Sequence, residues 1–89
     1  MFYPDAAEIL ARDLRAFLAR SSGARSPRPP KAVIVPHAGY IYSGATAAAV
    51  YASLAGACDV IRRVVLLGPC HRVAIDGLAL PSVSGFATP

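Results

Sequence analysis

The spacing of hydrophobic residues separates a helical first segment from a remainder that is typical of strands. In the first twenty residues, apolar side chains recur at intervals of three and four: Leu10, Leu14, Phe17 and Leu18. This spacing is that of one helix face, and Asp5, with Glu8 three residues later, fits a helix N-cap. The pattern therefore predicts an amphipathic helix over residues 5–20 that packs by its Leu/Phe face.

A proline-rich stretch follows the predicted helix. Residues 21–31 combine three prolines with serine and glycine, and proline can neither continue a helix nor lie inside a sheet. We expect a linker here rather than a boundary between domains, because neither flanking segment could fold alone.

Two short runs without polar alternation predict buried strands. Residues 33–35 (Val-Ile-Val) and 64–67 (Val-Val-Leu-Leu) are continuously apolar, as are parallel strands that are covered on both faces. Between them, the Ala-rich residues 44–54 have the length of one crossover helix, with Ser43 as its N-cap. The sequence therefore predicts a strand–helix–strand unit over residues 32–72 and an α/β fold.

The segment after the second predicted strand carries one further signal. Asp76 and Gly77 form a turn pair, and apolar residues follow it directly. This pattern predicts a partial third strand over residues 76–80.

One histidine follows each of the first two predicted strands. His37 and His71 would therefore lie at the edge where the carboxyl ends of parallel strands meet. They are 34 residues apart, which is too far for a local zinc-finger pattern, but imidazole is the commonest metal ligand. We predict that they converge as two ligands of an incomplete metal site. The alternative is that each is a hydrogen-bonded structural residue.

Side chains near the two histidines suggest further roles. Tyr40 and Tyr42 flank the first loop, where a hydroxyl could orient a substrate or donate a proton, or where the rings could form a pocket wall. Cys70 could be a thiolate ligand or a reactive thiol, or a small buried apolar residue. Asp76 is a candidate carboxylate partner for His71.

Composition limits the partners and the setting. Of the 89 residues, 55% are hydrophobic and 16% are charged, which favours part of a larger domain or an obligate associating unit. The net charge of +4 comes largely from a loop without interleaved aromatic residues, so we expect no nucleic-acid partner.

Residues 44–58 fall short of the ~20 apolar residues that span a bilayer, so we expect no membrane span. Two cysteines and no visible secretory signal favour a cytoplasmic setting.

Several motifs, taken together, resemble those of one protein family. They are Phe2-Tyr3-Pro4, Pro36-His37-Ala38-Gly39-Tyr40, Tyr42-Ser43-Gly44, Leu67-Gly68-Pro69 and His71. On these residues the chain is similar to the N-terminal part of the Memo family, whose bacterial and archaeal members are named AmmeMemoRadiSam system protein B. Two positions depart from the family pattern. Members often carry Ser or Asn in place of Cys70, and frequently a second histidine in place of Arg72.

The resemblance implies a fold and a metal site. Memo proteins are similar in fold to the LigB-like class III extradiol dioxygenases, which use non-haem iron(II). This similarity implies a three-layer α/β core with a central parallel or mixed sheet, of which only the N-terminal βαβ part would be present. It also implies that His37 and His71 are ligands of an iron or copper ion. The remaining ligands, a histidine and a cysteine, would come from family residues beyond Pro89.

Three functions stay open at this point. The first is a metal-dependent oxidoreductase similar to the extradiol dioxygenases, with Tyr40 or Tyr42 near a small-molecule substrate. The second is a non-catalytic module that binds a peptide or protein, and the third is an inactive truncated fragment. We expect the remainder of a Memo domain, or an associating subunit, as the partner that completes the site.

Overall fold

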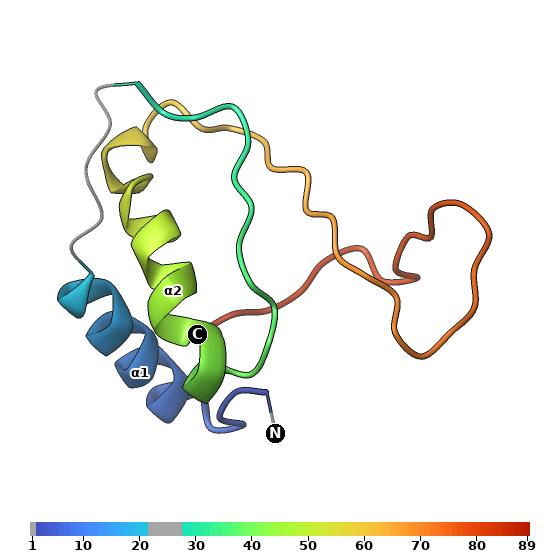
Figure 1. The fold of residues 1–89 in the computed structure, drawn as a ribbon, viewed down its shortest axis with the longest axis horizontal. Helices are drawn as coiled ribbons and strands as arrows, with labels where there is room; N and C mark the ends of the chain where they lie inside the picture. Colours follow the sequence, from blue (N-terminus) through green and yellow to red (C-terminus); the bar gives the residue numbers. More distant parts are fainter. Residues whose placement is uncertain (1, 22–27) are drawn as a thin grey trace.

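Two neighbouring helices and a long extended remainder make up the chain in a computed structural model, which describes residues 2–21 and 28–89 (Figure 1). The helices are α1 (Ala7–Arg20) and α2 (Tyr40–Ala52), and a short 3₁₀ turn, η1 (Ala55–Ala57), follows them. In Figure 1, α1 and α2 run side by side in the same direction. The extended residues before α2 carry the chain back along the helix pair.

The helix α1 lies where the apolar spacing predicts a helix, but it begins later than expected. Its N-cap is Ala6, whose carbonyl accepts the Leu10 N–H at 2.9 Å, so the prediction that Asp5 is the N-cap is wrong. An acidic residue, Glu8, lies in the first turn and a basic one, Arg20, in the last. Both charges suit the helix dipole.

The helix α2 begins four residues before its predicted start. Its N-cap is Gly39, and the Tyr40 N–H donates to the carbonyl of Phe2 at 2.8 Å. Ser43 lies inside the first turn, so the prediction that it is the N-cap is wrong. Its hydroxyl instead donates back to the carbonyl of Ala38 at 2.8 Å. The early start therefore rests on a contact with the N-terminal segment.

The helix α2 packs on α1 at Gly44 rather than on a sheet. The Phe17 ring lies against Gly44 and is edge-on to the Tyr40 ring, with ring centroids 6.3 Å apart. Because Gly44 has no side chain, the two helices approach closely at this point. The buried part of the described structure is small, and on α2 it consists of Ser43 and Ala48, which are 8% and 5% exposed.

The prediction of a three-layer α/β fold with a central parallel or mixed sheet is wrong. Residues 2–21 and 28–89 contain two α-helices and a 3₁₀ turn but no strand, so the predicted βαβ unit over 32–72 and the third strand over 76–80 are not formed. Residues 64–67 are extended, and each side chain in this run is at least 78% exposed. An apolar run shows a local preference for strand, but a sheet also needs backbone partners.

The described surface is large for a chain of this mass. The accessible area is 8245 Å², whereas a compact folded chain of 9.2 kDa exposes about 4,900 Å². The radius of gyration is 14.6 Å, against about 12 Å for a compact domain of this length. Apolar side chains that would normally be covered are therefore in contact with solvent.

Two sequence predictions concern the linker and the membrane. Of the predicted linker 21–31, residues 22–27 lie outside the described residues, and Arg25 lies among them. Neither helix of the described part is long and apolar enough to cross a membrane.

A substitution at the helix contact tests this packing. A methyl group at Gly44 would lie 2.8 Å from Cζ of Phe17, an overpacking that costs about 1–3 kcal/mol, against a gain of about 1 kcal/mol in helix propensity. We expect Gly44→Ala to lower the midpoint of urea unfolding, followed by circular dichroism. In a Phe17→Leu background the clash is relieved, and the same substitution should be neutral or stabilising. Equal effects in the two backgrounds would contradict this packing.

Candidate metal centre

His37 and His71 lie in direct contact. Their Nε2 atoms are 3.1 Å apart, whereas the ring centroids are 5.3 Å apart and the ring planes differ by 29°. The rings therefore meet through their nitrogen-bearing edges rather than face to face. A hydrogen bond at this distance requires one Nε2 to carry a proton and the other to accept it. Both side chains are exposed.

The two histidines lie close together, as the sequence predicts, but the predicted cause, a shared edge of a parallel sheet, is wrong. Each histidine follows an extended apolar segment, 33–35 or 64–67, and no backbone hydrogen bond joins these two segments. They therefore do not form the edge of a sheet. The first loop leads directly into α2, and the second lies on the extended chain that follows η1 (Figure 1).

The loop that carries His37 is anchored by two hydrogen bonds directly after the histidine. The Ser43 hydroxyl holds the carbonyl of Ala38, and the Tyr40 N–H holds the carbonyl of Phe2. Ser43 is 8% exposed, so this side chain bond is shielded from solvent. The backbone next to His37 is therefore fixed relative to α2 and to the N-terminal segment.

The loop that carries His71 makes mainly local contacts. The thiol of Cys70 donates to the carbonyl of Val73 at 3.0 Å and is exposed, so its interpretation as a small buried residue is wrong. The second cysteine, Cys58, is also a free, exposed thiol. The hydrogen-bond partner of His71 is His37, not the predicted Asp76.

Two imidazoles at this separation fit one metal ion. With metal–nitrogen distances of 2.0–2.1 Å, two nitrogens 3.1 Å apart subtend an angle of about 98° at the metal. This lies between the right angle of octahedral or square-planar sites and the tetrahedral angle. Both Nε2 atoms would have to be unprotonated, and the ring edges would have to turn to one side. The described residues hold no group of three or more potential ligands, so these two histidines fit part of a metal site.

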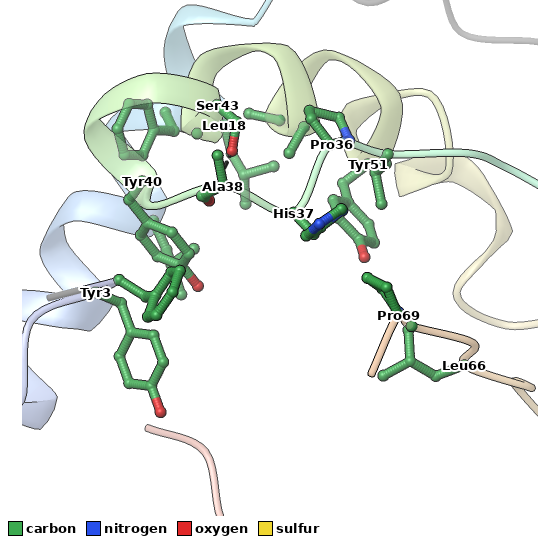
Figure 2. A pocket seen from close by; sticks show the side chains of 18 of the residues that line it. Tyr3, Leu18, Pro36, His37, Ala38, Tyr40, Ser43, Tyr51, Leu66 and Pro69 are labelled. Atoms are coloured by element: carbon green, nitrogen blue, oxygen red, sulfur yellow. Dashed lines mark hydrogen bonds between the residues drawn. The ribbon is translucent and has the colours of Figure 1, made fainter. Parts of the chain in front are cut away.

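A largely apolar pocket of about 1090 Å³ lies beside His37, and Figure 2 shows the residues around it. Its aromatic lining comes from the N-terminal segment, both helices and the C-terminal segment: Phe2, Tyr3, Phe17, Tyr40, Tyr51 and Phe86. His37 also lines this pocket, but His71 does not. The histidine pair therefore stands at the edge of the pocket, with one ring facing it.

The two tyrosines proposed from the sequence are separated by the structure. Tyr40 lines the pocket and packs on Tyr3, with ring centroids 5.9 Å apart. Tyr42 is 81% exposed and lies outside the lining. Tyr51 also lines the pocket but is not among the predicted residues. It follows Tyr40 by eleven residues, so helical periodicity places both on one face of α2.

Comparison with known proteins assigns the family. The whole chain, residues 1–89, matches the family described as Memo-like protein. The chain belongs to the Memo family. It is 39% identical over 88 residues to Protein MEMO1 of Xenopus tropicalis, which covers 99% of this chain and 28% of that protein. No solved structure matches the chain.

The Memo family similarity extends from animals to bacteria. Protein MEMO1 of Homo sapiens is 44% identical over 62 residues, which are 70% of this chain and 20% of that protein. The MEMO1 family protein of Aquifex aeolicus (strain VF5) is 45% identical over 60 residues, which are 67% of this chain and 21% of that protein. This chain therefore spans about a quarter of the length of the Memo relatives that it matches.

The anchoring of His37 in this Memo chain can be tested with two matched serines. Ser43→Ala removes the hydroxyl bond to Ala38, and Ser53→Ala removes a similar bond to Val50, of 2.6 Å, at the far end of α2. We expect each to lower the free energy of unfolding by about 1 kcal/mol. Only Ser43→Ala should weaken the nuclear Overhauser contacts between the His37 and His71 rings, because Ser43 is the one of these two serines that is bonded to the His37 loop. Equal loss in both variants would contradict a positioning role.

Proposed function

We propose that this chain is the part of a Memo-family metal-binding protein that supplies two ligands, His37 and His71, to an iron or copper ion. The observation that carries the proposal is the 3.1 Å separation of the two Nε2 atoms, which come from loops 34 residues apart. Neutral imidazole nitrogen suits both iron and copper. Because the two rings are exposed, an ion can reach them without opening the helix pair.

The pocket beside His37 gives the proposed site a place for an apolar substrate. When bound, an iron or copper ion would supply redox chemistry, as in the extradiol dioxygenases that the family resembles in fold. The chain's own residues bind and orient the substrate. Aromatic rings exclude water from it, and the hydroxyl of Tyr40 can donate a hydrogen bond to its polar group. The exposed Tyr42 has no such part in this proposal.

The rest of the site must come from other residues. The described part of the chain offers no third ligand beside the histidine pair, and the chain spans 28% of its Xenopus tropicalis relative. We propose that the remainder of a Memo domain, or an associating subunit, completes the coordination. The free thiols of Cys58 and Cys70 support a reducing, cytoplasmic setting.

Metal analysis of the full protein tests the ligand assignment. We expect His37→Ala and His71→Ala each to lower the affinity for iron(II) or copper by more than about tenfold, because even groups that only orient a metal ligand are worth 10–100-fold. Metal content after dialysis, measured by mass spectrometry, is the readout. Tyr42→Phe is the control, since this exposed residue lies away from the histidines and should leave the content unchanged. Unchanged stoichiometric metal in both histidine variants would remove the proposal.

A non-catalytic module that binds a peptide is the second candidate. The observation that favours it is the size and apolar lining of the pocket, together with the exposed apolar residues 64–67 beside it. Such a surface suits an extended apolar peptide. Peptide binding that survives removal of metal by chelation, with no oxygen consumption, would favour this candidate over the first.

A further inference from the structure

The first N–H of α2 is bonded to a segment that lies outside the helix. Gly39, the N-cap residue, has no side chain that could accept from the N–H groups of the first turn. The N–H of Tyr40 donates instead to the backbone carbonyl of Phe2 at 2.8 Å. The next amide, that of Ile41, has no acceptor within the described part of the chain. A bond from a residue far away in the sequence therefore replaces an N-cap side chain, three residues after His37.

The side chain of Tyr3 packs on the residue that donates this bond. The ring centroids of Tyr3 and Tyr40 are 5.9 Å apart and the ring planes differ by 42°, which is within the range of favourable aromatic pairs (Figure 2). Tyr40 in turn lies edge-on to Phe17 of α1. The hydroxyl of Tyr3 has no hydrogen-bond partner among the described residues, so the ring is the part of this side chain that makes the contact.

We infer that Tyr3 is a positioning residue for the metal ligand His37. Its ring, packed on Tyr40, keeps the carbonyl of Phe2 at the first N–H of α2. That bond fixes the backbone at the point where the His37 loop enters the helix. The inference rests on the proposed metal role of His37, because a ligand whose loop is already ordered loses less conformational entropy when it binds an ion.

Hydrogen exchange of single backbone amides in the full protein measures the bond to Phe2. The first N–H groups of a helix have no acceptor within it, so protection at Tyr40 reports this bond. We expect the Tyr40 amide to exchange more slowly than the Ile41 amide, each relative to its intrinsic rate. Tyr3→Ala should accelerate exchange at Tyr40 by roughly two- to tenfold, the worth of one aromatic pair, and Tyr3→Phe should leave it unchanged.

The affinity for iron(II) or copper separates positioning from general stability. We expect Tyr3→Ala to lower this affinity by the same factor of roughly two to ten and Tyr3→Phe to keep it. Ser53→Ala is the matched control, because it removes a hydrogen bond of 2.6 Å at the far end of α2. This control should lower the midpoint of urea unfolding but change neither the metal affinity nor the exchange rate at Tyr40.

Each other outcome overturns a stated part of the inference. Unchanged exchange at Tyr40 in Tyr3→Ala shows that the ring does not hold the Phe2 carbonyl. Faster exchange with unchanged metal affinity shows that the bond does not position His37. Equal losses in Tyr3→Phe or in Ser53→Ala remove the role of the ring. Metal binding that survives loss of both histidines overturns the proposed function and the metal part of this inference, and the exchange rates then decide alone whether Tyr3 orders the start of α2.

Discussion

The start of α2 depends on backbone groups outside the helix. The first N–H groups of any helix lack partners within it, and here the N–H of Tyr40 is bonded to the carbonyl of Phe2 at 2.8 Å. The shielded hydroxyl of Ser43 holds Ala38 in the loop before the helix. These two bonds join the N-terminal segment, the histidine loop and α2 into one unit. The position of His37, and with it the candidate site, follows from them.

Local patterns were enough to predict one helix but not the bounds of the other. The stripe from Leu10 to Leu18 is complete within α1, so periodicity locates that helix. The start of α2 is set by Phe2, which lies 38 residues earlier in the chain, and no local signal contains that contact. The local pattern therefore predicts Ser43 as the N-cap, although it lies inside the first turn.

The same distinction applies to the predicted sheet and to the predicted proximity of the two histidines. The apolar runs 33–35 and 64–67 show a preference for extended backbone, but the pattern of one segment cannot specify which segment pairs with it. The prediction of a sheet is therefore wrong. The described residues nevertheless bring His37 and His71 into contact, although no sheet joins their segments. Tyr51 could have been predicted from its helical phase with Tyr40, whereas Tyr3 could not, because its packing is a long-range contact.

The uneven burial of the chain has a consequence for any ion that joins the two histidines. His37 lies next to a half-buried helix start, but every residue from 58 to 89 is exposed, so little besides its own turns orders the segment around His71. Restricting that segment costs conformational entropy, and this cost is subtracted from the coordination energy. Binding of an ion to both rings would then be coupled to the ordering of the C-terminal third, so that the ion would also act as a folding ligand.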